Sequence, residues 1–420
     1  MTDGNGMIDI RNINIVPNEP VQEESIIRVV GVGGGGCNAV SYMYDKGIEG
    51  CKFIVCNTDA QALAKSNVPC KVILGDGRGA GTKPEKAEKA AIESIDKICD
   101  EIIGDKTQML FVTACLGGGT GTGASHVIAN KAKEKGILTI GVVTIPFKYE
   151  GAQAFSKAQD GLELMRKSVD SLLIIDNNKL IEIYGKDMIH EAFPKVDKIL
   201  ETAVRGIIEI ITVPGDINMD FEDVKTMMTN SGMALMGCGE GKGENRLEDA
   251  VKQALESPLL RVTDLKTARN LLLNITVSKN EHGVTMEEYD RISSLISDYI
   301  GNVDKAKRGL IYNESKDADD TVKITAIVTG FDSTIDVLKG IFGESNNRYI
   351  VIDEDYICPE DDIPTDNAEE GAKIMTRAGR NDNKPIFNFD DPPILFVERT
   401  DDKSILQNTS AFRRKKSTEK

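Results

Sequence analysis

Tryptophan is absent from the chain, and histidine, a common metal ligand, occurs only 3 times. The 8 cysteines are scattered and form no Cys-X-X-Cys pair, so no zinc site is predicted and the thiols should be reduced and mostly buried. No apolar run is long enough to cross a bilayer, since the longest extends only from Ile137 to Phe147. The first residues, MTDGNGMIDI, contain no signal-peptide core. These absences predict a cytoplasmic protein without direct membrane insertion.

Positive charge is also in short supply. The chain has 51 Lys and Arg against 67 Asp and Glu, a net charge of −16. Such a surface repels phosphate backbones, so we expect no nucleic-acid partner. A length of 420 residues with 40% hydrophobic residues predicts two or three ordinary globular domains, each with its own core.

Short apolar runs alternate with helical stretches after a polar leader at residues 1–25, which we expect to be disordered. The runs are continuous and β-branched, which is typical of parallel strands covered on both faces. They are IIRVV from Ile26, FIVCN from Phe53, MLFVTA from Met109, LTIGVVTIP from Leu138 and SLLIID from Ser171. The pattern predicts an α/β fold with a parallel-sheet domain at residues 26–193.

A long central helix is predicted at residues 194–213. Apolar residues recur there at helical spacing, with Pro194 at the start and Pro214 just after the end. A smaller α/β C-terminal domain is expected at residues 214–335, followed by an acidic linker at 336–400 and a basic C-terminal tail at 401–420. Its expected elements are LLLNITVS from Leu271, a helix from Met286 to Tyr299 and VKITAIVTG from Val322.

A glycine-rich turn follows the first predicted strand, where residues 31–36 read GVGGGG and open the next helix. Backbone N–H groups and the helix dipole at such a junction can hold phosphate. Four consecutive glycines lose much backbone entropy on folding, which favours a ligand over a plain turn. The run also satisfies Gly-X-Gly-X-X-Gly, with Asp59 ending the next strand, so a dinucleotide-binding oxidoreductase is the main alternative.

A second glycine-rich turn, GGGTGTG at residues 117–123, follows the strand from Met109 and precedes a helix expected from Ala124. Two such turns at neighbouring strand ends could hold a polyphosphate from both sides, with hydrogen bonds from Thr120 and Thr122. No Walker lysine follows either run, so ordinary P-loop chemistry is disfavoured. A different class of nucleotide triphosphatase is therefore indicated.

The second turn is the signature of tubulin-type GTPases, and GVGGGGCNAV, FIVCNTDAQAL, VVTIPF, VPGDINMDFEDV and NSGMALMG accompany it. In this order and spacing, from about Ile26 to Gly330, the motifs resemble the FtsZ family of bacterial cell-division GTPases. The resemblance implies GTP or GDP with Mg²⁺, head-to-tail homopolymers that hydrolyse GTP at subunit interfaces, and a cytokinetic ring at the division site. It also implies that membrane-anchoring and regulatory division proteins bind the C-terminal tail.

The family's functional positions carry over to individual residues. Catalysis is implied for Asn218, Asp220 and Asp223, which would face the γ-phosphate held by the neighbouring subunit, although Asn218 or Asp220 could otherwise simply cap a helix. No metal site is expected from side-chain clusters, since Mg²⁺ would be held mainly through the GTP phosphates. Nucleotide contacts are implied for Gly34, Gly35, Asn38, Asn57, Asp59, Gly117, Gly118, Gly119, Thr120, Gly121, Thr122, Glu150 (ribose), Asn177 (guanine), Asn178 and Phe193 (guanine).

Three features depart from the family pattern. The loop at 75–84, GDGRGAGTKP, is shorter than usual, and Ala154 stands where an arginine is common. Asn178 replaces an aspartate that reads guanine. A divergent filament protein that binds nucleotide but hydrolyses it weakly is therefore the second hypothesis, and Lys83, Lys148 or Lys157 would supply the missing cation. The apolar stretches within residues 385–397 are predicted to be either partner-docking segments or aggregation-prone strands.

Overall fold

The computed structural model describes most of the chain from Ser25 to Phe331. The described ranges are 25–184, 188–213, 220–257, 259–260, 265–278, 283–301, 303–313 and 320–331, with three short strands further on. The chain divides into two compact units, the first comprising Met1–Leu260 and Ala268–Phe331, and the second Arg261–Thr267 and Asp332–Lys420. Both glycine-rich turns lie in the first unit.

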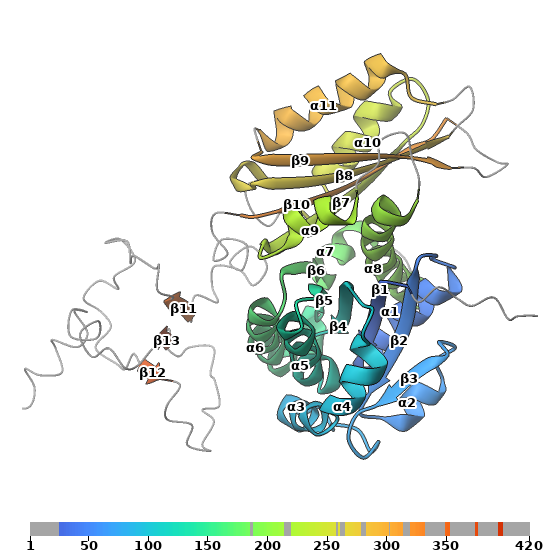
Figure 1. Ribbon diagram of the computed structural model, residues 1–420. Coiled ribbons are helices and arrows are strands. Elements are labelled where there is room, and N and C mark those ends of the chain that lie inside the picture. Colours follow the sequence, from blue (N-terminus) through green and yellow to red (C-terminus); the bar gives the residue numbers. More distant parts are fainter. Residues whose placement is uncertain are drawn as a thin grey trace, which may run out of the picture. The chain divides into compact units, whose positions relative to one another are not determined.

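A ten-stranded sheet in the order β3-β2-β1-β4-β5-β6-β7-β10-β8-β9 forms the frame of the first unit (Figure 1). Neighbours from β3 to β7 are parallel, as are β8 and β9, whereas β10 is antiparallel to β7 and β8. The strands are Ile27–Val32 (β1), Cys51–Asn57 (β2), Cys70–Ile73 (β3), Met109–Cys115 (β4), Leu138–Ile145 (β5), Ser171–Asp176 (β6), Gly232–Gly241 (β7), Asn270–Ser278 (β8), Lys305–Asn313 (β9) and Val322–Thr329 (β10).

Most crossovers between these strands contain helices, as parallel pairing requires. They are Gly33–Asp45 (α1), Ala60–Ala64 (α2), Pro84–Glu93 (α3), Ile95–Lys97 (α4), the π-helical turn Ile98–Ile103 (η2), Thr120–Glu134 (α5), the 3₁₀ turn Lys148–Glu150 (η3), Ala152–Ser168 (α6), Asn177–Tyr184 (α7), Ile189–Thr212 (α8), Phe221–Met228 (α9), Arg246–Leu255 (α10) and Met286–Ile300 (α11). Thr285 and Glu288 form a reciprocal capping box that fixes the start of α11.

Both faces of the parallel part of the sheet are buried. Val29 of β1 and Phe111 of β4 belong to one large apolar cluster, while the adjacent Val30 and Leu110, which point to the opposite face, are also 0% exposed. This is why the strand sequences are continuous apolar runs without alternation.

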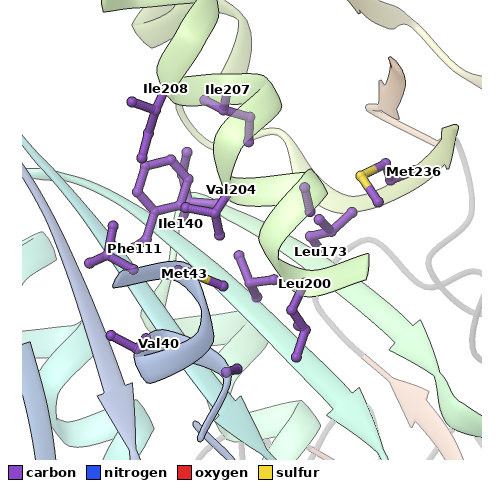
Figure 2. Packing of buried hydrophobic residues seen from close by; sticks show 14 of the residues in the cluster. Val40, Met43, Phe111, Ile140, Leu173, Leu200, Val204, Ile207, Ile208 and Met236 are labelled. Atoms are coloured by element: carbon purple, nitrogen blue, oxygen red, sulfur yellow. The ribbon is translucent and has the colours of Figure 1, made fainter. Parts of the chain in front are cut away.

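Helix α8 lies at the centre of this cluster, against α1 and the strands (Figure 2). Burying each of its apolar side chains contributes roughly 1.5–3 kcal/mol to folding. The labelled members are Leu200, Val204, Ile207 and Ile208 of α8, Val40 and Met43 of α1, Phe111 of β4, Ile140 of β5, Leu173 of β6 and Met236 of β7.

The seam between the nucleotide half and the C-terminal half of the sheet is short. β6 and β7 pair through Ser171 with Gly232, Leu172 with Met233 and Leu173 with Ala234, and no further. β7 then pairs with β10 along its length, from Gly241 to Ala234. Helix α8 spans the same seam through its buried side chains, which contact residues of both halves.

Two helices begin earlier than the sequence predicts. Helix α8 begins at Ile189 and continues through Pro194, which the sequence placed at its start because proline lacks the N–H needed in a helix interior. Helix α5 begins at Thr120 and not at Ala124, so Gly121 and Gly123 of the second turn are helical. Glycine has low helix propensity, but close packing requires it: a Cβ on Gly123 would lie 1.9 Å from the Pro84 carbonyl oxygen.

The second unit contains a 3₁₀ turn, Leu265–Thr267 (η4), and a parallel sheet in the order β11-β13-β12. Its strands are Tyr349–Ile352 (β11), Ile374–Thr376 (β12) and Ile394–Val397 (β13). These short apolar runs lie within the segment that the acidic composition predicts to be a linker. β13 lies within the apolar stretches of residues 385–397, for which partner docking or aggregation remains a prediction.

Candidate functional site

The two glycine-rich turns meet at the carboxyl ends of β1 and β4, which are neighbouring parallel strands. A Cβ on Gly33 would lie 2.7 Å from the backbone nitrogen of Gly121. Helix α1 begins at Gly33 and α5 at Thr120, so two helix N-termini open at one place. Their unbonded N–H groups and aligned dipoles favour an anionic ligand.

Gly34 and Gly118 are the glycines of these turns with open space around them. A Cβ on either would meet no protein atom within 4 Å, and neither has a positive φ. A Cβ on Gly35, by contrast, would lie 2.3 Å from Sγ of Cys115, so packing alone requires that glycine. Neither packing nor backbone conformation requires glycine at 34 or 118, and glycine there leaves room for the close approach of a ligand.

Asn38 lies one helical turn beyond Gly34 on α1, and both are exposed. Its side chain is therefore on the side of α1 from which a ligand could approach the first turn.

The threonine hydroxyls of the second turn are used within the protein. The hydroxyls of Thr120 and Thr58 are hydrogen-bonded at 2.7 Å. Oγ1 of Thr122 accepts a 2.9 Å hydrogen bond from the N–H of Gly117, and Thr122 is 2% exposed. Thr122 therefore shapes the turn, whereas the half-buried Thr120 keeps a side toward solvent.

Asp59 and Asn57 are also committed to local structure. The Asp59 carboxylate caps α2 by accepting from the N–H groups of Gln61 and Ala62. The buried Asn57 accepts from the N–H of Asp59 through Oδ1 at 3.3 Å. A dinucleotide-binding fold would need this acidic group for a ribose hydroxyl, and here it serves as a helix cap.

The loop at 75–84 packs over the second turn. A Cβ on Gly119 would lie 3.2 Å from Cα of Thr82 and 3.1 Å from the nitrogen of Lys83. Thr82 has φ 58°, a conformation that costs energy for a residue other than glycine. Nζ of Lys157 donates a 2.8 Å hydrogen bond to the Thr82 carbonyl oxygen, so this lysine reaches the loop that borders the turn.

Asp197 of α8 and Glu150 of η3 are carboxylates near the first turn. Burial raises the pKa of Asp197 to about 6. Burial also raises the pKa of Cys115 to about 11, and the charges of Asp197 and Glu150 add to that rise. Because Sγ of Cys115 lies directly beneath Gly35, both carboxylates are in the neighbourhood of the first turn.

Asn178 and Asn177 differ in how fully they are bonded. Oδ1 of Asn178 accepts from the N–H of Lys148 at 2.8 Å, and Nδ2 donates to the Pro146 carbonyl and to Oδ1 of Asp176. Burial raises the pKa of Asp176, although the bonds from Asn178 oppose the rise. Oδ1 of the buried Asn177 has no hydrogen-bond partner among the described residues, so it can accept from a ligand.

The predicted catalytic carboxylates lie in the first turn of α9. Asp220 caps this helix, accepting from the N–H of Asp223 at 2.7 Å. The Asp223 carboxylate accepts a 2.6 Å hydrogen bond from Nζ of Lys307 in an ion pair. Asn218 and the side chain of Phe193 lie outside the described residues.

Within the described ranges, no group of three or more His, Cys, Asp or Glu is arranged to hold a metal ion. The seven cysteines among the described residues are unpaired. A helix long and apolar enough to cross a membrane is not found in the described part either.

Comparison with known families accounts for both halves of the first unit. The Tubulin/FtsZ family GTPase domain matches residues 26–185, and the FtsZ family C-terminal domain matches residues 232–332. The chain belongs to the FtsZ family. As a member of a GTPase family, it binds guanine nucleotide, and the family assignment replaces the oxidoreductase alternative.

A bacterial cell-division protein and a mitochondrial division protein match this chain at similar sequence identity. Cell division protein FtsZ of Pseudomonas putida is 42% identical over 331 residues, which cover 77% of this chain and 80% of that protein. Mitochondrial division protein fszA of Dictyostelium discoideum is 46% identical over 313 residues, which cover 74% of this chain and 59% of that protein.

Solved structures support the same assignment. An empty FtsZ dimer of M. jannaschii aligns with a TM-score of 0.68 and 38% identity, covering 74% of this chain and 89% of that chain. CetZ1 of Haloferax volcanii, a GDP-bound monomer, aligns with a TM-score of 0.65 over 75% of this chain and 97% of that chain. At 18% identity, the second comparison shows a shared fold alone.

Sequence reasoning did not select Asp197, although a signal for it exists. Asp197 lies three residues before the buried Leu200 and seven before the buried Val204, so it continues the apolar stripe of α8. An ionisable residue in such a stripe is an exception that suggests a function or a buried partner.

Proposed function

We propose that this FtsZ-family chain is a GTPase that polymerises head-to-tail and hydrolyses GTP where one subunit completes the site of the next. The observation that carries the nucleotide half of the proposal is the contact between the two glycine turns, with open space at Gly34 and Gly118. The triphosphate would lie across the N-termini of α1 and α5, against the N–H groups of both turns.

The base and the ribose would lie between α1, α7 and α8. Guanine has two adjacent donors, N1–H and the 2-amino group, which the Asp197 carboxylate can accept together. The unpartnered Oδ1 of Asn177 is a further acceptor, and Asn38 on α1 borders the same space. Asn178 would act indirectly, because its side chain hydrogen-bonds the backbone segment that follows β5 and so links that segment to the end of β6. Glu150 would contact the ribose.

The catalytic half would come from the neighbouring subunit through Asn218, Asp220 and Asp223. A carboxylate can orient the attacking water for in-line displacement, and loop amides stabilise charge on the phosphoryl group. Asp220 is already used as the cap of α9, so Asp223 is the better candidate for direct contact with water or phosphate. Mg²⁺ would be held mainly through the phosphates and would neutralise charge there.

In the cell, such polymers would form the ring at the division site, in the cytoplasm or its organellar equivalent. The chain's tail, 401–420, would bind membrane-anchoring and regulatory division proteins, and its basic residues suit an acidic groove. Domain boundaries at 26–193, 194–213 and 214–335 remain our proposed division of the polymerising part.

The deciding experiment measures GTP turnover per subunit against protein concentration, with Mg²⁺ present and light scattering recorded on the same samples. Turnover and scattering that appear together above a threshold concentration would support an interface-assembled GTPase. Turnover independent of concentration would contradict it, because the site would then be complete within one subunit. Scattering without turnover would favour a filament protein with weak hydrolysis, which the short loop at 75–84 and Ala154 motivate.

A further inference from the structure

Helix α9 is held in place at its carboxyl-terminal half, by apolar packing and a side-chain hydrogen bond. Val224, Met227 and Met228 are buried, and Nδ2 of Asn270 at the start of β8 lies 3.5 Å from the Met227 carbonyl oxygen. These contacts fix the carboxyl-terminal half of the helix. Its amino-terminal turn, at residues 220–223, is more open, because Asp220 and Glu222 are exposed to solvent.

Lys307 reaches this open turn from outside α9. It lies on β9, beside Leu272 of β8, and its Nζ is 2.6 Å from Oδ1 of Asp223. The side chain of Lys307 is 43% exposed and that of Asp223 is 33% exposed. The pair therefore lies at the surface, where Asp223 can still be approached by a ligand.

A second lysine near the same turn makes a different contact. Lys225 of α9 pairs with Glu222 at 3.6 Å and lies over the ring of Phe221. Its side chain is 41% exposed, close to the value for Lys307. The two lysines therefore match in charge and exposure, and they differ in which carboxylate they hold.

We propose that Lys307 is a positioning residue for GTP hydrolysis, which holds the Asp223 carboxylate toward the nucleotide of the neighbouring subunit. The proposal rests on the catalytic role proposed for Asp223. An aspartate at a helix surface can rotate about χ1 and χ2, and a fixed ammonium partner on a strand restricts that rotation. The turn carries three carboxylates, at positions 220, 222 and 223, which would repel an incoming triphosphate. The positive charge of Lys307 lowers that repulsion.

An alternative is that the pair is only an ordinary surface ion pair. Exposed pairs of this kind contribute little to stability. The two roles differ in their consequences, because a stabilising pair would change the melting temperature slightly and leave hydrolysis in assembled polymer unchanged. A positioning role would change hydrolysis and leave nucleotide binding to the free subunit unchanged.

The test compares Lys307→Met, Lys307→Arg and the matched control Lys225→Met in the full-length chain. For each, GTP affinity is measured below the assembly threshold, and phosphate release is measured per subunit in sedimented polymer. We expect Lys307→Met to lower release per assembled subunit by about tenfold or more, with GTP affinity unchanged. Lys307→Arg should recover most of the rate, and Lys225→Met should behave as wild type.

Release at the wild-type rate or faster in Lys307→Met polymer would overturn the proposal, as would an equal loss in Lys225→Met. If Lys307→Met does not assemble alone, equimolar copolymers with wild type should release phosphate at about half the wild-type rate, since half the interfaces carry the variant turn. An undiminished copolymer rate would also overturn it. Asp223→Asn serves as the reference, because full activity in that variant would show that the proposed function of the turn, and not Lys307, is at fault.

Discussion

Replacing Asp197 with asparagine tests how the base is recognised. At neutral pH the Asp197 carboxylate is ionised, since its pKa is about 6, and it can accept from both N1–H and the 2-amino group of guanine. Asparagine would turn one acceptor into a donor facing the base. Hydrogen bonds to charged groups contribute roughly 1.5–3 kcal/mol, so GTP affinity should fall by about 10- to 150-fold.

The assay is equilibrium binding of GTP and ITP to the free subunit, kept below the assembly threshold. Hypoxanthine lacks the 2-amino group, so wild type should prefer GTP over ITP and Asp197→Asn should lose most of that preference. A matched substitution, Asp176→Asn, alters a carboxylate that is already bonded to Asn178. It should leave the ratio of the two affinities close to wild type.

The pH dependence supplies an independent check with a defined sign. Burial raises the folded pKa of Asp197 from 3.8 to about 6, so this group makes the free protein less stable as pH rises between those values. Guanine binding needs the ionised form, so GTP affinity should fall as pH drops below about 6, by up to tenfold per unit. Asp197→Asn should lose this dependence and gain thermal stability at pH 7. An unchanged GTP to ITP ratio together with an unchanged pH profile would refute the assignment.

Three further predictions follow from contacts in the site. Gly118→Ala should weaken GTP binding by about tenfold or more, because the added methyl group would occupy the space left for the ligand. It should change the free energy of unfolding by less than about 0.5 kcal/mol, because its Cβ meets no protein atom. Calorimetry measures the binding and thermal melting the stability, and a loss of stability would contradict the open space around Gly118. Gly123→Ala should lower the free energy of unfolding by about 1–3 kcal/mol in a denaturant titration, since its Cβ would lie 1.9 Å from the Pro84 carbonyl oxygen. An unchanged midpoint would be inconsistent with that packing. Asp223→Asn should lose hydrolysis but bind GTP normally. Mixing it with Gly118→Val, which should bind nucleotide poorly, should restore phosphate release in trans; a mixture as inactive as its components would argue against a shared site.

Much of the fold follows from the sequence because its parallel strands are continuous apolar runs. The strands predicted from Ile26, Phe53, Met109, Leu138 and Ser171 are all present, as β1, β2, β4, β5 and β6, with ends that differ by up to two residues. β3 and β9 were not predicted, because the first is short and the second, KAKRGLIYN, is half polar. β7 was missed because four of its ten residues are glycine, which local propensity disfavours in strands.

The glycines of β7 have a packing reason that only the structure reveals. A Cβ on Gly237, Gly239 or Gly241 would lie 1.9–2.0 Å from a carbonyl oxygen of α10. Alternate glycines therefore let this helix lie directly on the strand. Such a requirement comes from a neighbour more than a few residues away, so propensity and periodicity do not contain it.

The parts of the site that the backbone forms could be predicted from the sequence, whereas the roles of individual side chains were harder to predict. Glycine runs at strand ends identify the turns, because few other structures need them. A sequence does not tell whether Thr122 or Asn178 bonds a ligand or its own backbone, and the structure has both bonded internally. Asp197 was overlooked because it stands in a stripe of apolar residues, where the periodic pattern draws attention to its neighbours.

The short seam between β6 and β7 has a mechanical consequence for a filament. Three residue pairs join the two halves of the sheet there, and the buried side of α8 packs against both halves. In a filament of these subunits, interfaces between subunits would alternate with the β6–β7 seam inside each subunit. The more flexible of these two connections would determine how easily the filament bends. Apolar substitutions in the carboxyl-terminal half of α8, beyond the part that carries Asp197, should therefore change the persistence length of such a filament.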